Sequence, residues 1–322
     1  MRTTITRRIA PLLLLVAAPL AAAPLAAQQP ATAQRAVLVT GASSGIGRKI
    51  AELLASQGHF VYGGARKAED LAALSKIKNV QGVKLDVNID ADIAAAVETV
   101  RRGGRGLYGV VNNAGIAIVA PLIHVDEKEL RALFDVNVFG PYRITKAFAP
   151  LVIDAKGRVV NISSISGILS GPFFGPYSMS KHAIEAYGDA LATEMNSFGV
   201  KVSLIEPGNY RSEIGRNTTA QAAAAAARAK GTPFEAPMER MVAAMGNYDS
   251  YPEPDDVAQA ALHALFDPAP KMRYMVVPAA RQAEVTINKA IEELVQLNQA
   301  HKFSYDRESL VRKLDSALAR IR

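Results

Sequence analysis

Short apolar runs alternate with amphipathic stretches along the chain from residue 36 to about residue 280. The first run, Ala36 to Thr40, lacks polar alternation, as expected of a strand buried on both faces of a sheet. Similar runs predict strands at residues 59–65, 80–87, 107–112, 158–162, 200–205 and 273–277, and helices are predicted at 49–56, 68–76, 91–102 and 219–230. Strands that alternate with helices pair in parallel through right-handed crossovers. The pattern therefore predicts an α/β fold, a doubly wound parallel sheet of about seven strands with helices on both faces.

Residues 1–33 differ from the rest of the chain and form a predicted leader. Three arginines among the first eight residues precede an uncharged stretch from Ile9 to Ala27, and small residues follow. This order is typical of a secretory signal peptide, so we expect export to the periplasm and no stable membrane insertion after the leader is removed. Arg7-Arg8 belongs to a partial twin-arginine signal, or simply to the basic region of an ordinary one. A membrane anchor, or a misplaced start that leaves the protein cytoplasmic, would also fit these residues.

Residues 281–322 form a polar C-terminal extension beyond a single domain at 34–280. Two amphipathic helices are predicted from apolar residues at helical spacing, Ile287, Ile291, Leu294 and Leu297, then Leu310, Leu314, Leu318 and Ile321. We expect this extension to cover apolar surface of its own domain. It could instead assist oligomerisation or close the active site.

Composition removes several classes of function. The 322 residues include no cysteine, which excludes disulfides, a thiol nucleophile and thiolate metal sites, and the five histidines are scattered, so no metal is predicted. The net charge is +7, but three of these charges are the arginines of the leader. The remaining charge is small and dispersed, so we expect no nucleic-acid partner.

The first predicted strand runs into a glycine-rich loop, Thr40 to Gly47, that opens a helix. Such a loop lets the backbone approach a pyrophosphate whose charge lies at the helix N-terminus. The predicted cofactor contacts are Gly41 for the turn, Ser43 and Ser44 for their hydroxyls, Gly45 for close approach, Ile46, and Gly47 for tight helix packing. Dinucleotide binding on a Rossmann-type fold is therefore predicted, although an ordinary strand-to-helix turn would have a similar sequence.

The residues after the second and third strands bear on the choice of cofactor. An acidic residue after the second strand would bind a free ribose 2′-hydroxyl, but Arg66 stands there instead. Because its guanidinium suits a phosphate, NADP is favoured over NAD, unless Arg66 and Lys67 are merely a solvated pair. Asp86 and Val87, which end the third strand, are expected to border the adenine.

Tyr177 and Lys181 are spaced to share one face of a helix that begins after a strand and the loop containing Ser164. A free phenol has a pKa too high for proton transfer at neutral pH, and a cation about 4 Å away favours the phenolate by about 4 kcal/mol, which offsets part of the cost of burial. Ser164 is predicted to hydrogen-bond a substrate carbonyl. Tyr142 and Lys146 have the same spacing but lie within a helical stretch, so we expect that pair to be structural.

Together these motifs resemble the short-chain dehydrogenases/reductases over residues 35–280, in the branch with T-G-x-x-x-G-x-G and Y-x-x-x-K motifs. The resemblance implies that Tyr177 is the acid/base, Ser164 polarises the carbonyl and Lys181 binds the nicotinamide ribose while lowering the pKa of Tyr177. It also implies that Asn137 holds a water in a proton relay. Further implied cofactor contacts are Asn113, Ala114, Gly115, Pro207, Gly208 and Ser212, where the family often has threonine. Asn112-Asn113 could instead serve only to stabilise the sheet.

The activity implied is hydride transfer between NADP, or NAD, and a secondary alcohol, ketone or aldehyde. The segments at 167–176 and 209–255 would select the substrate, and the apolar run before Tyr177 suits a hydrophobic one. Residues 198–208 are similar to the branch that handles retinoids and hydroxysteroids. Phe173 and Phe174 could instead make core or dimer contacts, and a homo-oligomer, a dimer or tetramer, is expected. The competing function is a catalytically silent dinucleotide-binding or sensor protein on the same fold.

Overall fold

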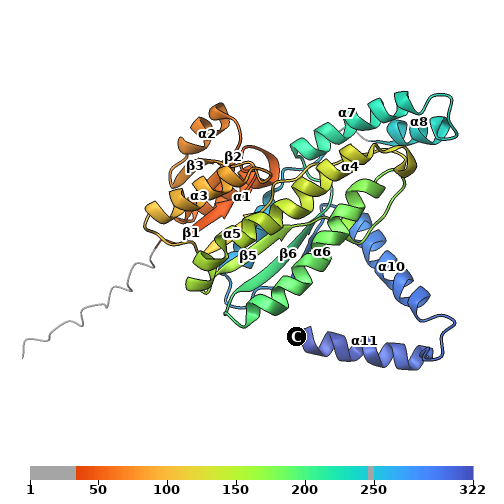
Figure 1. The fold of residues 1–322 in the computed structure, drawn as a ribbon. Coiled ribbons are helices and arrows are strands. Elements are labelled where there is room, and N and C mark those ends of the chain that lie inside the picture. The colour runs from red at the N-terminus through yellow and green to blue at the C-terminus, as the bar shows by residue number, and fades with distance from the viewer. Residues whose placement is uncertain (1–33, 246–249, 322) are drawn as a thin grey trace, which may run out of the picture. The chain divides into compact units, whose positions relative to one another are not determined.

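A seven-stranded parallel sheet forms the centre of the computed structural model, which describes residues 34–245 and 250–321 (Figure 1). Its strand order is β3-β2-β1-β4-β5-β6-β7. The strands are β1 (Ala36–Val39), β2 (Phe60–Ala65), β3 (Val80–Lys84), β4 (Gly109–Asn112), β5 (Arg158–Ile162), β6 (Lys201–Pro207) and β7 (Arg273–Val276). The order reverses between β1 and β4, and the carboxyl ends of the strands on both sides of that point face one edge. Ligands of open α/β sheets bind at this edge.

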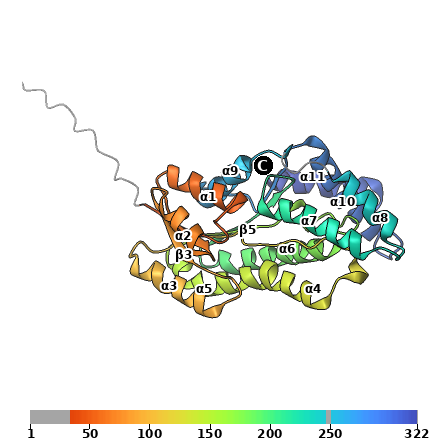
Figure 2. The ribbon, with the colours of Figure 1, turned by 90° about the horizontal axis from the view of Figure 1, so that it is seen from above.

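Helices cover both faces of the sheet (Figure 2). One layer contains α1 (Gly45–Ser56), α2 (Ala68–Ser75) and α9 (Asp255–Phe266), and the other contains α3 (Asp90–Arg102), α5 (Gly140–Asp154) and α6 (Gly175–Asn196). Side chains alternate along β1, so that Val37 and Val39 pack towards the first layer while Leu38 packs towards the second. Both faces are therefore buried, which explains why the strands are continuous apolar runs.

The sequence prediction of a doubly wound parallel sheet of seven strands is confirmed. The differences lie at element ends, since β3 stops at Lys84 and leaves Asp86 and Val87 in the loop that follows. The alanine-rich stretch is helical, within α7 (Glu213–Arg228), and α8 (Glu235–Ala244) packs beside it. The remaining helix of the domain is α4 (Glu127–Phe134), which a short π-helical stretch, Asp135–Phe139, joins to α5.

The C-terminal extension contains the two predicted helices, α10 (Ala280–Leu297) and α11 (Arg307–Ile321), drawn in blue in Figure 1. The expectation that the apolar residues of this extension cover the surface of the domain is wrong for most of α10 and α11. Ile287, Ile291 and Leu294 of α10 are 49%, 52% and 51% exposed, and Leu314 and Leu318 of α11 are similar. Only the first turns of α10 are packed closely, where Thr286 is fully buried.

The predicted leader, residues 1–33, lies outside the described residues, and export stays a prediction. Within the described part of the chain, no helix combines the length and apolar character that crossing a membrane requires.

Candidate active site

The loop after β1 is held in shape by backbone conformation and by a ring of hydrogen bonds. Gly41 and Gly45 have φ angles of +64° and +52°, the left-handed region that favours glycine. The Thr40 hydroxyl accepts hydrogen bonds from the backbone N–H groups of Asn113 and Ala114, at 2.9 and 3.0 Å. The Asn113 amide donates to the carbonyls of Thr40 and Gly41, at 2.9 and 3.1 Å. Asn113 thus ties the loop after β4 to the glycine loop.

Gly47 leaves the space that this arrangement needs. A Cβ atom at Gly47 would collide with the Asn113 amide and the Gly41 carbonyl. The predicted role of Gly47 in tight packing therefore agrees with the geometry. Ser44, the N-cap of α1, makes no side-chain capping bond, so the amides of the first turn of α1 are available to a phosphate at the cavity wall. The loop fits the pyrophosphate of a dinucleotide.

The two adjacent asparagines have different roles. Asn112 Nδ2 donates to Asn161 Oδ1 at 2.9 Å and to Thr145 Oγ1 at 3.0 Å, which links β4 to β5 and α5. The sheet-stabilising role thus describes Asn112, whereas Asn113 holds the glycine loop and lines the cavity.

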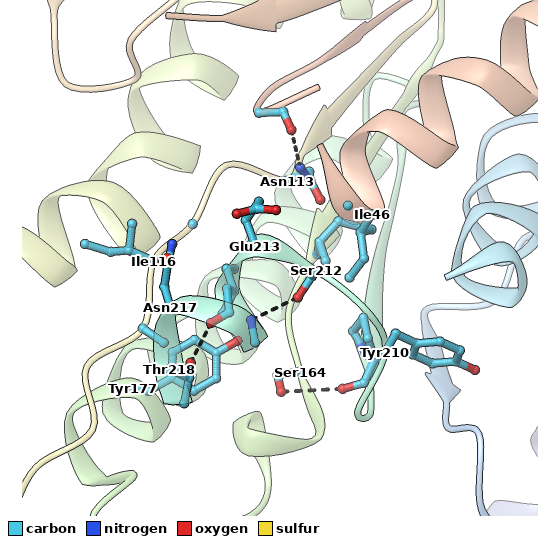
Figure 3. A pocket seen from close by; sticks show the side chains of 18 of the residues that line it. Ile46, Asn113, Ile116, Ser164, Tyr177, Tyr210, Ser212, Glu213, Asn217 and Thr218 are labelled. Carbon is cyan, nitrogen blue, oxygen red and sulfur yellow. Dashed lines mark hydrogen bonds between the residues drawn. The ribbon is translucent and has the colours of Figure 1, made fainter. Parts of the chain in front are cut away.

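A cavity of about 700 Å³ runs along the carboxyl edge of the sheet (Figure 3). Its described lining includes these predicted cofactor residues: Gly41, Ser43, Ser44, Gly45, Ile46, Arg66, Asp86, Val87, Asn113, Ala114, Gly115, Pro207, Gly208 and Ser212. Gly47 lies behind the wall. At one end Arg66 is exposed beside the ends of β2 and β3, where the predicted adenosine site would be.

Three of the four predicted catalytic residues, Ser164, Tyr177 and Lys181, line the cavity together. Tyr177 and Lys181 project from the first turns of α6, and Ser164 begins a short 3₁₀ turn after β5. The Ser164 hydroxyl accepts from the Ser166 N–H at 3.1 Å. Lys181 Nζ lies 5.6 Å from the centre of the Tyr177 ring and donates to the Ile162 carbonyl at 2.9 Å. This arrangement can present a phenol and a serine hydroxyl to one carbonyl oxygen.

Burial dominates the ionisation of this group. Desolvation raises the pKa of Tyr177 to about 12, and a hydrogen bond with Ser164 opposes that rise. Desolvation lowers the pKa of Lys181 to about 8, and the charge of Glu185 opposes this. The net direction for Tyr177 is thus upward in this site, because burial outweighs the opposing hydrogen bond, and the predicted lowering of its pKa by Lys181 stays a prediction.

Asn137 lies behind the cavity wall, on the π-helical stretch. Its Nδ2 donates to the Ile116 carbonyl and to Ser180 Oγ, both at 2.9 Å, and its Oδ1 accepts from the Ile116 N–H at 2.9 Å. Both amide protons are therefore used within the protein, so the side chain has no donor left for a water. The predicted relay water stays a prediction, while the geometry shows Asn137 holding the loop at Ile116.

The helix α7 forms a further wall of the cavity, beside the walls made by the glycine loop and the start of α6. Ser212 caps α7 by accepting from the Gly215 N–H at 3.2 Å, and a Cβ atom at Gly45 would lie 3.1 Å from Ser212 Cα. Figure 3 shows Ser164, Tyr177, Ser212 and Asn217 around the same pocket.

From the sequence, substrate selection was expected in residues 209–255, but no substrate-contacting residue of this segment could be named. Cavity-lining residues there come from α7, the end of α8 and the segment that follows, and include Ile214, Asn217, Thr218, Gln221, Ala244, Met245 and Tyr251. Ile214, Asn217, Thr218 and Gln221 follow helical spacing, so the pattern was present, but nothing local marks which face meets the cavity.

The extension also reaches this site. Gln282, in the first turn of α10, accepts through Oε1 a hydrogen bond of 2.9 Å from the Asn209 N–H. Gly208 N–H donates to the Val276 carbonyl at 2.8 Å. The turn after β6 is thus held between β7 and α10.

Tyr142 and Lys146 have the same spacing as Tyr177 and Lys181, but they do not lie in the cavity. Both side chains are exposed on α5, Lys146 Nζ lies 5.6 Å from the Tyr142 ring centre, and neither residue lines the cavity described above. The choice of Tyr177 from its sequence context is consistent with this placement.

Comparison with known proteins decides the family. The sequence pattern of the short chain dehydrogenase family matches residues 35–223. The chain belongs to the short-chain dehydrogenase family. A solved short-chain dehydrogenase from Streptomyces avermitilis superposes with a TM-score of 0.69 at 30% identity, covering 84% of this chain and 96% of that one.

Two named proteins are similar to this chain in sequence. The mitochondrial D-beta-hydroxybutyrate dehydrogenase of Rattus norvegicus is 39% identical over 193 residues, which cover 57% of this chain and 56% of that enzyme. The NADPH-dependent 3-dehydrocapnine reductase of Ornithobacterium rhinotracheale is 36% identical over 254 residues, which cover 76% of this chain and 88% of that one. The chain therefore matches just over half the length of the rat enzyme and most of the bacterial one.

Proposed function

We propose that this protein is an NADP-dependent oxidoreductase that interconverts a hydrophobic secondary alcohol and its ketone. The observation that carries the proposal is that Tyr177, Ser164 and Lys181 share one cavity with the glycine loop. A protein that only binds a dinucleotide, without catalysis, would not need a buried phenol beside a buried ammonium group.

In the proposed reaction the bound nicotinamide supplies or accepts the hydride. During reduction, Ser164 donates a hydrogen bond to the substrate carbonyl, and the Tyr177 hydroxyl gives its proton to the same oxygen. Lys181 supplies a positive charge beside the phenolate that this transfer leaves. Oxidation runs through the same residues in reverse, with Tyr177 accepting the alcohol proton.

Arg66 supports the choice of NADP. Its exposed guanidinium stands at the end of β2 on the cavity wall, where an acidic residue would repel a 2′-phosphate. The 3-dehydrocapnine reductase to which this chain is similar is named as NADPH-dependent, in agreement with this assignment.

The far end of the cavity supports an uncharged, largely apolar substrate. Ile116, Leu169, Phe174 and Met245 belong to the cavity lining outside the predicted cofactor contacts, with Asn217 as a neutral polar group, and the acidic residues of the described lining are Asp86 and Glu213. Among the described lining residues the cations are Arg66, at the opposite end, and Lys181. A ketone with an apolar body fits this lining better than a small carboxylate does.

The experiment combines binding with turnover on the protein without residues 1–33. Titration with NADPH and NADH, followed by nicotinamide fluorescence, should show NADPH binding at least tenfold more tightly, and Arg66→Ala should remove most of that preference. Tyr177→Phe should abolish reduction of hydrophobic ketones with unchanged NADPH binding. Tyr142→Phe, which removes the same hydroxyl beside a lysine at the same spacing, is the control and should retain activity. Full activity in Tyr177→Phe would refute the mechanism, and tighter NADH binding would refute the assignment of Arg66.

A further inference from the structure

Four charged side chains gather one helical turn beyond Lys181. Glu185 and Asp189 come from α6, Glu206 from β6 and Arg273 from β7. Arg273 Nε lies 3.1 Å from Glu185 Oε2 and 3.4 Å from Glu206 Oε1, and Arg273 Nη2 lies 2.7 Å from Asp189 Oδ1. We call these four residues the Arg273 cluster. A single guanidinium thus serves three carboxyl groups.

The two inner carboxyl groups of the cluster are buried. The side chains of Glu206 and Glu185 are 3% and 12% exposed, whereas that of Asp189 is 55% exposed. Within the described residues Glu185 Oε1 has no hydrogen-bond donor. Burial, and then the charge of Glu185, raise the pKa of Glu206 to about 7, although Arg273 opposes this. Glu206 therefore holds its proton up to about neutral pH.

One of the two inner carboxyl groups, that of Glu185, adjoins the active-site residues. Glu185 follows Lys181 by four positions, so the two side chains leave the same face of α6. Glu185 also packs against Gly167, since a Cβ atom there would lie 2.8 Å from Glu185 Cγ and 3.0 Å from Ser163 Oγ. The cluster thus touches the turn that begins at Ser164 as well as the helix that carries Lys181.

We propose that Glu185 and Glu206, clamped by Arg273, are positioning residues that keep Lys181 charged in its buried site. This inference rests on the proposed function, in which the charge of Lys181 supports proton transfer by Tyr177. Glu185 supplies the counter-charge one helical turn from Lys181, and Glu206, beside Glu185, adds a second negative charge when it ionises. Asp189 and Arg273 are the remaining charged groups that face Glu206, and Arg273 holds the pair in place.

The Arg273 cluster affects Lys181 because Glu206 ionises at a lower pH than the one at which Lys181 loses its proton. As the pH rises through about 7, Glu206 ionises, and its negative charge opposes loss of the proton from Lys181, whose pKa burial lowers to about 8 although the charge of Glu185 opposes this. The cluster therefore extends the pH range in which Lys181 remains a cation.

The test uses substitutions that keep shape and remove charge. Glu206→Gln mimics the protonated carboxyl and should fold, and it should move the alkaline limb of kcat/KM for NADPH-dependent ketone reduction at least half a pH unit lower. Activity near pH 6 should stay within about twofold of the wild type, because Glu206 is already protonated there. Glu185→Gln should move the same limb further. Glu98→Gln, which removes an exposed carboxylate paired with Arg101 on α3, is the control and should move it by less than a tenth of a unit.

The same limb is also measured without turnover, as the pH above which the wild type loses affinity for NADPH. An unmoved limb in both Glu206→Gln and Glu185→Gln, with normal wild-type activity and binding, would overturn this inference and leave the proposed function intact. A wild-type protein that neither binds nor oxidises NADPH would overturn both.

Discussion

The buried phenol of Tyr177 sets the pH behaviour of the reaction at the scale of single residues. Desolvation holds its pKa at about 12, so the hydroxyl is protonated throughout the neutral range and is ready to act as an acid. The reverse reaction needs the phenolate, which is a small fraction of the molecules at neutral pH. Burial lowers the pKa of Lys181 to about 8, which bounds the pH range in which its charge supports proton transfer.

We therefore expect opposite pH profiles for the two directions. The kcat/KM for ketone reduction should be flat from about pH 6 to 8 and fall above it. The kcat/KM for alcohol oxidation should rise by nearly tenfold per pH unit over the same range, because the phenolate fraction grows in that proportion. Initial rates with both cofactor forms in overlapping buffers measure this. An oxidation rate independent of pH between 6 and 8 would contradict a phenol with a raised pKa as the proton acceptor.

At the scale of elements, the Arg273 cluster joins α6, β6 and β7 at a cost that depends on pH. A carboxyl group whose pKa is raised on folding binds more protons in the folded state than in the unfolded state. The folded protein is therefore favoured below about pH 4.5, and this contribution is lost as the pH rises through the folded value of about 7 for Glu206. Above that pH the buried charge of Glu206 weakens the joint between the three elements.

Glu206→Gln should remove this dependence. Its free energy of unfolding should equal that of the wild type near pH 4.5 and exceed it by up to about 3 kcal/mol near pH 8, since each unit of pKa difference is worth about 1.4 kcal/mol. Urea unfolding at both pH values measures the difference. A variant that is less stable than the wild type at both pH values would show that the ionised form of Glu206 is the stabilising one.

The elements themselves were predictable because the sheet is parallel and buried on both faces. Val37, Leu38 and Val39 form an unbroken apolar run, and the same pattern marks the other strands. Tyr177 was distinguished from Tyr142 because its helix follows a strand and a serine loop. The Arg273 cluster was not foreseen, since Glu206 reads as the polar end of a strand and its partners lie 21 and 67 positions away in the sequence. Contacts between distant positions leave no local pattern.

At the scale of the whole molecule, the C-terminal extension is tied to the site by its first turns and exposed beyond them. Thr286 is fully buried, and the Asn209 N–H donates to Gln282 Oε1 at 2.9 Å, which holds the start of α10 beside the turn after β6. Further along, the apolar side chains of α10 and α11 are about half exposed. The homo-oligomer expected from the sequence stays a prediction.

Gln282→Ala should lower the affinity for NADPH, although Gln282 does not line the cavity. Loss of the hydrogen bond to the Asn209 N–H frees the turn that contains Pro207 and Gly208, and a hydrogen bond of this kind contributes about 1 kcal/mol. We expect NADPH to bind up to about fivefold more weakly, and the free energy of unfolding to fall by no more than about 1 kcal/mol. Gln296→Ala, an exposed glutamine on the same helix, should bind as the wild type does, and an equal loss in both variants would point to a general effect on α10 instead.

The contact between Gly208 and Gln282 should also make substitutions at these two positions depend on each other in evolution. A methyl group at position 208 would occupy the place of Gln282 Oε1, so an alanine there evicts the amide and costs the same hydrogen bond. Once either Gly208 or Gln282 has been replaced by alanine, this hydrogen bond is already lost. Replacing the other residue then has little further effect on stability. Gly208 and Gln282 should therefore be kept or lost together along a lineage, although residue 282 lies beyond the segment by which the family is recognised.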